Sequence, residues 1–282
     1  MLVNFPIQPV WNTLARRAPT PVKRWYRRIA RPADFALEKE LERLESFPRY
    51  VRTTTNLLGS VITMVDSPSF LAQYGSIFRR EKYRFRARRP DPTILDCGAN
   101  IGMMTIYWKR LYPLARITAF EPDPDVFSVL SWNITQLGYP DVVLHQCAVW
   151  TSPGEFAFWA EGADAGRLMR PHNTNRPACL VEAVRLRDYL DSEIDMLKLD
   201  IEGAEVEVIL DSADKLHNIQ NILIEYHSFH SQKQRIDELM HALLSADFRI
   251  HVLPDTVSKQ PFVSRSDNFG MDLQLDVFAF RP

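Results

Sequence analysis

Hydrophobic positions in the central part of the chain alternate between short runs typical of buried strands and spacings typical of helices. Apolar runs predict five strands, at residues 94–95, 116–120, 142–146, 194–200 and 219–226. Between them, apolar residues three and four apart predict helices over 103–111, 126–137 and 206–213. A further helix over 236–244 and strands near 248–253 and 275–281 complete the pattern, which predicts an α/β fold.

The chain before residue 91 follows a different pattern. Residues 34–47 have helical spacing, 57–65 predict a strand or hairpin, and 70–85 predict a helix. Tyr74 and Tyr83 in this last segment either pack in the core or close over a ligand. We therefore divide the chain into a basic arm (1–33), a helical and strand extension (34–90) and a main domain (91–282). In the main domain, residues 154–160 alternate as an added strand, and 162–177 form a long loop.

A glycine-spaced turn, Asp96-Cys-Gly-Ala-Asn-Ile-Gly102, follows the first predicted strand of the main domain. A side chain at Gly98 or Gly102 would obstruct a ligand at the backbone or the packing of helix on strand. The next strand ends at Glu121, 25 residues after Asp96, where nucleotide-binding folds place an acid that receives ribose hydroxyls. The turn is therefore predicted to bind a nucleotide cofactor.

Two cofactor types share this geometry, namely dinucleotides such as NAD and S-adenosylmethionine. A dinucleotide pyrophosphate usually meets a Gly-x-Gly-x-x-Gly loop, whereas here the pattern is Gly98-x-Asn100-x-Gly102, preceded by the acid Asp96. That carboxylate would repel a pyrophosphate and attract the positive amino group of S-adenosylmethionine, so we favour the methyl donor.

Three segments in order resemble the FkbM-type family of S-adenosylmethionine-dependent methyltransferases: residues 96–102, Phe120-Glu-Pro122, and Leu197-Lys-Leu-Asp-Ile-Glu-Gly-Ala-Glu205. The resemblance implies a Rossmann-like class I methyltransferase at 91–282. In that fold a mostly parallel seven-stranded sheet carries helices on both faces and an antiparallel last strand, and the segment before the domain lies beside the cofactor pocket. It also implies an O-methyltransferase acting on a sugar or another small molecule.

The resemblance further implies a set of cofactor-binding residues, with the adenine near Cys147 and Ala148. The expected set is Asp96, Gly98, Ala99, Asn100, Gly102, Thr105, Glu121, Pro122, Cys147 and Ala148. Position also makes loop 162–177 a candidate lid over the acceptor.

Ligands of such folds bind beyond the carboxyl ends of the strands, so Asp200 and His227 are expected to share the crevice with Glu121. A hydroxyl is a poor nucleophile until it loses its proton. Asp200 and His227 are therefore candidate bases, with Glu225 third. Glu202 is expected to cap the helix that follows it.

Asp200, Glu202 and His227 together also offer ligands for a divalent ion. The absence of a dedicated metal spacing weighs against a metal requirement. After the fourth strand the sequence reads Asp200-Ile-Glu-Gly203, without the Asn/Asp-Pro-Pro-Tyr/Phe tetrapeptide of many amine methyltransferases. An oxygen acceptor is therefore preferred. The alternatives are an NAD-type oxidoreductase and a macromolecule-directed or non-catalytic member of the fold.

Composition adds a few constraints. The 282 residues carry a formal net charge of −1, and neither an apolar run of eighteen residues nor a signal-peptide pattern occurs, so a cytoplasmic location is expected. Cys97, Cys147 and Cys179 lack metal spacing and are expected to be small buried residues.

The first 33 residues contain seven Lys or Arg and no acid. This basic arm is interpreted as a solvated tail, or as a contact with an anionic membrane surface or a neighbouring subunit in an oligomer. Nucleic acid is the least favoured partner. The arm also resembles an organelle transit peptide, although Pro6, Pro9, Pro19 and Pro21 would interrupt its helix.

Overall fold

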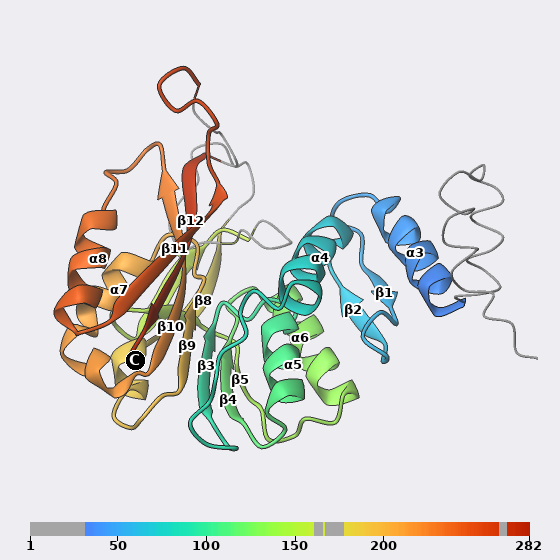
Figure 1. Ribbon diagram of the computed structural model, residues 1–282, viewed down its shortest axis with the longest axis horizontal. Coiled ribbons are helices and arrows are strands. Elements are labelled where there is room, and N and C mark those ends of the chain that lie inside the picture. Colours follow the sequence, from blue (N-terminus) through green and yellow to red (C-terminus); the bar gives the residue numbers. More distant parts are fainter. Residues whose placement is uncertain (1–31, 161–165, 167–177, 265–269) are drawn as a thin grey trace, which may run out of the picture.

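The computed structural model describes residues 32–160, 166, 178–264 and 270–282. Its main element is a seven-stranded sheet in the order β11-β12-β10-β9-β3-β4-β5 (Figure 1). Five of the strands pair in parallel with their neighbours, and β12 runs antiparallel to both β10 and β11. The predicted sheet is thus confirmed. Its strands are β3 (Thr93–Cys97), β4 (Arg116–Phe120), β5 (Val143–His145), β9 (Met196–Leu199), β10 (Asn221–Phe229), β11 (Arg249–Thr256) and β12 (Met271–Phe280).

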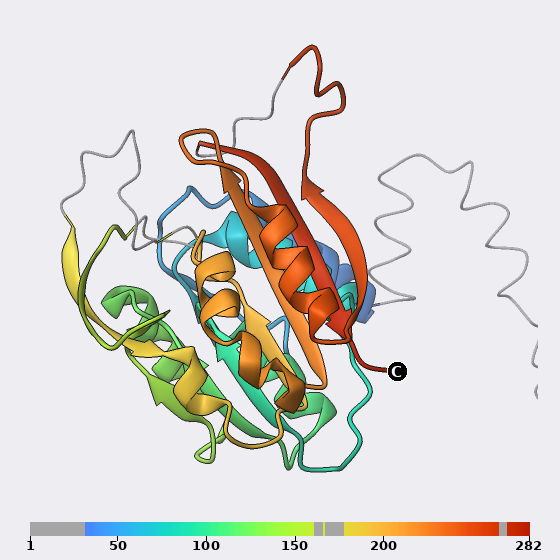
Figure 2. The same cartoon turned by 90° about the vertical axis from the view of Figure 1, so that its left-hand side faces the viewer.

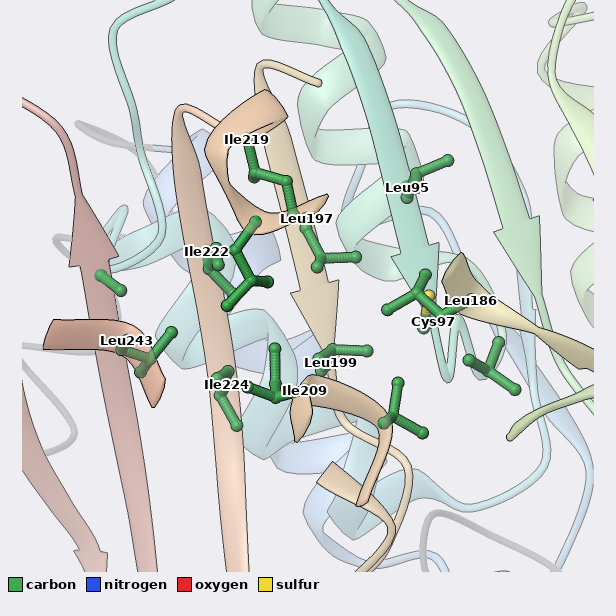
Figure 3. Close-up of a cluster of buried hydrophobic side chains, with 14 of the residues drawn as sticks. Leu95, Cys97, Leu186, Leu197, Leu199, Ile209, Ile219, Ile222, Ile224 and Leu243 are labelled. Carbon is green, nitrogen blue, oxygen red and sulfur yellow. The ribbon is translucent and has the colours of Figure 1, made fainter. Parts of the chain in front are cut away.

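Helices cover both faces of this sheet, as predicted (Figures 1 and 2). On one face lie α4 (Ser67–Tyr74), α5 (Met103–Leu111) and α6 (Pro124–Gln136); on the other lie α7 (Glu205–Asp211) and α8 (Ile236–Ser245). Successive side chains of a strand point to opposite faces, so Ile94 packs with α5 and α6 while Leu95 packs on the α7 and α8 side. Figure 3 shows this second core, in which Leu197, Ile224 and Leu243 come from β9, β10 and α8.

The extension consists of α3 (Pro32–Glu45), a hairpin of β1 (Thr53–Thr55) and β2 (Ile62–Met64), then α4 and a π-helix, η1 (Gly75–Arg79). The helix was predicted, but α3 begins two residues inside the predicted arm. Of the hairpin, only β2 lies in the segment 57–65 that was predicted as a strand or hairpin, and β1 comes before it. The single helix predicted over 70–85 is wrong, because α4 gives way to the wider π-helical turns at Gly75. Tyr74 stacks against Phe70 and Phe78 at 6.1 Å, which supports its core-packing interpretation.

A second, three-stranded sheet joins β6 (Ala148–Trp150), β8 (Cys179–Arg185) and β7 (Gly154–Phe158). Only β7 was predicted. Two 3-10 helices, η2 (Leu186–Tyr189) and η3 (Ala213–Asn218), were not predicted either. Cys97 and Cys147 are buried as expected, and Cys179 is partly buried.

Residues 1–31 of the basic arm and all of loop 162–177 except residue 166 lie outside the described residues. Within the described part of the chain, no helix combines the length and apolar character needed to cross a membrane.

Gly98 fixes how closely two strand ends approach each other. Its φ is +78°, and a Cβ built there would lie 1.8 Å from the backbone oxygen of Asp200. A side chain at Gly98 would therefore collide first with the loop after β9, rather than with a ligand as the sequence suggested. At Gly102, φ is +92° and a Cβ would lie 2.8 Å from a side-chain carbon of Leu130 in α6, so packing against a helix is what requires glycine there.

Replacing Gly98 should therefore destabilise the fold more than replacing a glycine in open space. Gly138 is the matched control, because its φ is +69° and nothing lies within 4 Å of the point that a Cβ would occupy. We expect Gly138→Ala to lower the free energy of unfolding by about 1 kcal/mol through backbone strain alone. Gly98→Ala should lower it by roughly 3 kcal/mol or more, because overpacking adds to the strain. Urea titration of both variants measures the difference, and equal losses would contradict the proposed contact.

Candidate active site

Two adjoining cavities open at the carboxyl ends of the parallel strands. The Glu121 cavity is lined by the ends of β3 and β4 and by Cys147 and Ala148. The Glu225 cavity, of about 410 Å³, is lined by α4, α5 and the ends of β9, β10 and β12. Five residues line both cavities: Gln73, Gly98, Asn100, Asp200 and Glu202. The predicted crevice therefore exists and has two compartments with a common wall.

Glu121 is held rigidly at the end of β4. Its two carboxylate oxygens accept hydrogen bonds from the backbone amides of Asn100 and Asp123, each at 2.9 Å. Asn100 adopts a φ of +51°, a left-handed conformation that turns its amide toward Glu121. Burial raises the pKa of Glu121 to about 7, although the two amides oppose the shift. Each oxygen keeps a second lone pair for a ligand hydroxyl.

Lys198 is a buried cation within the otherwise apolar β9. Its Nζ lies 3.5 Å from Oδ1 of Asp96, 3.2 Å from Oδ2 of Asp200 and 2.7 Å from the Gly98 carbonyl. Burial would lower the pKa of Lys198, but the carboxylates of Asp200 and Asp96 raise it above its usual value. The ammonium therefore joins the glycine-spaced turn to the loop after β9.

Four acids and one histidine gather where β9 ends, beside residues 225–227 of β10. Nε2 of His227 lies 3.7 Å from Oε1 of Glu202 and 3.7 Å from Oε1 of Glu225. Its Nδ1 lies 3.1 Å from Oε1 of Glu205. Ligand atoms of Asp200, Glu202 and His227 all lie within 4.8 Å of one another. Asp200, Glu202 and Glu225 line the Glu225 cavity, whereas His227 lies behind them.

The predicted capping role of Glu202 is wrong. Helix α7 begins at Glu205, and it is Glu205 whose Oε1 accepts hydrogen bonds from the amides of Ile201 and Gly203, at 3.2 and 3.0 Å. Glu202 instead has a φ of +56°, and its side chain, 11% exposed, faces His227. A left-handed conformation is uncommon outside glycine and marks a position held by its surroundings.

The position of His227 makes it a poor candidate for the base. The side chain is fully buried and lies within β10, rather than after the strand as predicted, because pairing with β12 extends β10 to Phe229. Burial would lower the pKa of His227, but the carboxylates of Glu202 and Glu205 raise it well above its usual value. Because His227 also lines neither cavity, we favour Asp200, on their common wall, as the base. Glu225, on the cavity wall, stays the second candidate.

The predicted cofactor residues fall into two groups. Gly98, Ala99, Asn100, Glu121, Pro122, Cys147 and Ala148 line one or both cavities. Asp96, Gly102 and Thr105 are buried and line neither. Asp96 accepts a 2.7 Å hydrogen bond from Thr105 and faces Lys198. These three residues support the turn on the side away from the cavities. The carboxylate of Asp96, which was expected to attract the donor's amino group, is already paired with Lys198.

Sequence reasoning missed Lys198 and Gln274, whereas the extension was expected beside the cofactor pocket and does line the Glu225 cavity. The sequence did contain a signal for Lys198, because an isolated lysine in an apolar strand needs a buried partner for its charge. Gln274, which donates to Glu225, comes from β12, and its place depends on long-range strand pairing. Tyr83 lines the Glu225 cavity and donates a 3.2 Å hydrogen bond to Asp276. Burial, together with the Asp276 charge, raises the pKa of Tyr83 far above its usual value.

A model of the methyltransferase FkbM domain matches residues 96–250, more than half of the chain, across this site. The chain belongs to the FkbM methyltransferase family. Among its relatives, Methyltransferase 1 of Beauveria bassiana (strain ARSEF 2860) is 32% identical over an alignment of 162 residues, and the match covers 48% of this chain and 64% of that protein. The 2-O-methyltransferase NoeI of Sinorhizobium fredii (strain NBRC 101917 / NGR234) is 28% identical over an alignment of 159 residues, and the match covers 49% of this chain and 64% of that protein.

Among solved structures, that of the methyltransferase FkbM from Methylobacillus flagellatus KT aligns with 95% of this FkbM-family chain and 58% of its own. The TM-score is 0.48 and the sequence identity 16%. This chain thus spans less than two thirds of the length of all three proteins.

Removing the Lys198 ammonium should leave the fully buried carboxylate of Asp96 without its counter-charge and the partly exposed Asp200 unpaired. We expect Lys198→Met to lower the free energy of unfolding by about 3–5 kcal/mol. Lys109→Met is the matched control, because Lys109 is equally buried but its partner Asp141 is 55% exposed and is solvated without it. Lys109→Met should lower the free energy of unfolding clearly less than Lys198→Met does. Adding Asp96→Asn to Lys198→Met should recover some of the loss, and denaturant titration that finds no recovery would contradict the pairing.

Proposed function

We propose that this protein is an S-adenosylmethionine-dependent O-methyltransferase that acts on a hydroxyl of a sugar or another small molecule. The observation that carries the proposal is Glu121, which is buried at the end of β4 with both oxygens oriented by backbone amides and a cavity in front of it. A carboxylate at this point of a βαβ unit accepts the two hydroxyls of a ribose. Because the chain belongs to a methyltransferase family, we assign that ribose to the methyl donor, S-adenosylmethionine.

The residues around the Glu121 cavity suit an adenosine. Pro122, Cys147 and Ala148 give it an apolar wall for a base, and Glu121 provides the polar anchor. The wall common to both cavities carries Asp200 and Glu202, whose negative charges favour a cationic group there. S-adenosylmethionine supplies an electrophilic methyl group on a sulfonium of that charge.

The same acids argue against a dinucleotide. A pyrophosphate would have to lie near the turn at Gly98, next to the carboxylates of Asp200 and Glu202. Like charges at short range in a poorly hydrated cavity repel strongly. The alternative of an NAD-type oxidoreductase is therefore weaker than the methyltransferase proposal.

The Glu225 cavity is our candidate for the acceptor site. Its volume of about 410 Å³ is in the range of small-molecule pockets, and its lining mixes methionines with carboxylates. The residues Asp200-Ile-Glu-Gly203 after β9 do not form the tetrapeptide that holds exocyclic amines. The name of the relative NoeI, a 2-O-methyltransferase, also supports an oxygen acceptor.

Within this proposal the chain's own residues position the acceptor and remove its proton. Asp200 stands between the two cavities, where its carboxylate accepts the hydroxyl proton. The ion pair with Lys198 at 3.2 Å fixes the orientation of that carboxylate. Met103 and Met104 on α5 line the same cavity and exclude water around the reacting hydroxyl.

Calorimetry and a product assay test the proposal in turn. S-adenosylhomocysteine should bind to the purified full chain and NAD should not. Methyl transfer from labelled donor should then be screened on hydroxylated acceptors, sugars first. Binding of NAD in preference to S-adenosylhomocysteine would overturn the proposal in favour of an oxidoreductase.

Donor affinity should depend on pH through Glu121. Because the pKa of Glu121 is about 7 in the free protein, the carboxyl is mostly protonated at pH 6 and mostly ionised at pH 8. Only the ionised form accepts two ribose hydroxyls well, so S-adenosylhomocysteine should bind about 5- to 10-fold tighter at pH 8 than at pH 6. Glu121→Gln should bind about 10- to 100-fold more weakly than wild type at pH 8 and show a flatter pH profile. A variant with the wild-type profile would contradict the ribose assignment.

Turnover should depend on Asp200. We expect Asp200→Asn to reduce kcat by about 10²- to 10⁴-fold with little change in S-adenosylhomocysteine affinity, because proton removal matters mainly in the transition state. Asp91→Asn is the matched control and should keep full activity, because Asp91 lies just before β3, at the amino ends of the parallel strands, and is 46% exposed. An Asp200→Asn enzyme as fast as wild type on a confirmed acceptor would exclude Asp200 as the base.

A further inference from the structure

We propose that Asp200, Glu202 and His227 form a divalent-cation site that faces the Glu225 cavity. This proposal rests on the proposed function for its catalytic meaning, but the site itself is argued from geometry alone. It adds a component that neither family membership nor the glycine-spaced turn supplies.

The first argument is the spacing of the ligand atoms. One oxygen of Asp200, one oxygen of Glu202 and one ring nitrogen of His227 all lie within 4.8 Å of one another. Two ligands on opposite sides of an ion, each about 2.1–2.4 Å from it, are roughly 4.2–4.8 Å apart. The three atoms thus surround a point that an ion can occupy with shifts of a few tenths of an ångström.

The second argument is the orphaned nitrogen of His227. Nε2 is buried and makes no hydrogen bond to any group in the described part of the chain. It points at Glu202 and Glu225 from 3.7 Å, beyond hydrogen-bonding distance to either. A buried ring nitrogen without a partner is costly, and a metal ion at the centre of these carboxylates would satisfy it.

The third argument is the partner of the other ring nitrogen. Nδ1 of His227 lies 3.1 Å from Oε1 of Glu205, which is itself fixed by the amides of Ile201 and Gly203. With the proton on Nδ1, Nε2 presents its lone pair to Asp200 and Glu202. A carboxylate that holds the distal nitrogen of a histidine is the usual support of a metal ligand in proteins. Glu205 is therefore a positioning residue for the site.

The charge balance is consistent with a cation. Glu205, Glu202, Glu225 and Asp200 surround His227, and Asp276 and Gln274 approach from β12. Against them stand Lys198, which Asp200 shares with Asp96, and Lys82, which pairs with Asp276. A divalent ion among these carboxylates would offset more of their negative charge.

The donor set selects the kind of ion. Two carboxylates suit Mg²⁺, Ca²⁺ and Mn²⁺, and an imidazole favours transition metals. Mn²⁺ satisfies both preferences, so we infer the order Mn²⁺ above Mg²⁺ above Ca²⁺. Because Asp200 and Glu202 line the Glu225 cavity, the ion would have an open side toward the acceptor. There it would bind the acceptor hydroxyl and lower the pKa of that hydroxyl.

The test measures binding of Mn²⁺ alone to the chelator-treated full chain, without donor or acceptor. Free Mn²⁺ is followed by electron paramagnetic resonance at about pH 7.5, in the wild type and in Glu202→Gln, His227→Gln and His230→Asn. His230 is the matched control, because it belongs to another histidine–carboxylate pair, 3.8 Å from Asp272. Thermal unfolding and S-adenosylhomocysteine binding of each variant establish that it is folded.

We expect one Mn²⁺ site in the wild type, at least 10-fold weaker binding in Glu202→Gln and His227→Gln, and wild-type binding in His230→Asn. Absence of a Mn²⁺ site in the wild type, or binding of wild-type strength in either site variant, would overturn the proposal. If one site variant does not fold, the other decides.

Failure of this inference and failure of the proposed function give different results. Mn²⁺ binding without any binding of S-adenosylhomocysteine would keep the cation site and overturn the methyltransferase proposal. Binding of S-adenosylhomocysteine and transfer of the methyl group, with no Mn²⁺ site, would keep the methyltransferase proposal and overturn the cation site. If both hold, a chelator should abolish methyl transfer, Mn²⁺ should restore it, and donor affinity should stay within about 3-fold.

Discussion

The burial of charge at the carboxyl ends of β3, β9 and β10 is the constraint on which the rest of the site depends. Lys198 offsets this negative charge, because its ammonium faces Asp96 on one side and Asp200 on the other. A lone carboxylate in this interior would be neutralised rather than ionised. The same ammonium binds the Gly98 carbonyl, so the turn at residues 98–102 and the loop after β9 are held by one group. The two cavities share a wall for this reason.

Glu205 has a comparable role at the start of α7. Its carboxylate binds two backbone amides of the loop and the ring of His227, and it thereby determines where Glu202 can lie. The left-handed backbone at Glu202 is strained, and these contacts keep it in place. The loop 200–203 is therefore a rigid carrier of carboxylates rather than a simple connection between β9 and α7.

Much of the fold could be predicted from the sequence because the strands of the main domain are apolar on both faces and glycine-marked turns separate them from helices. The positions of Glu121 and Asp200 at strand ends follow from that pattern alone. The position of His227 inside a strand does not follow from that pattern. Strand β10 is extended by pairing with the antiparallel strand β12, which lies about fifty residues later in the chain. For the same reason Gln274 was missed. The contact of Phe78 in η1 with Tyr107 in α5 is likewise a tertiary contact that local spacing does not reveal.

Strand β12 follows every other described element in the chain, yet it lies inside the sheet between β10 and β11. It also carries Gln274 and Asp276, which contact Glu225 and the Lys82–Tyr83 pair of the extension. During synthesis, β10 and β11 therefore leave the ribosome without the strand that joins them. The Glu225 cavity is then assembled only after β12 itself has left the ribosome, and until that moment the facing edges of β10 and β11 need protection from aggregation.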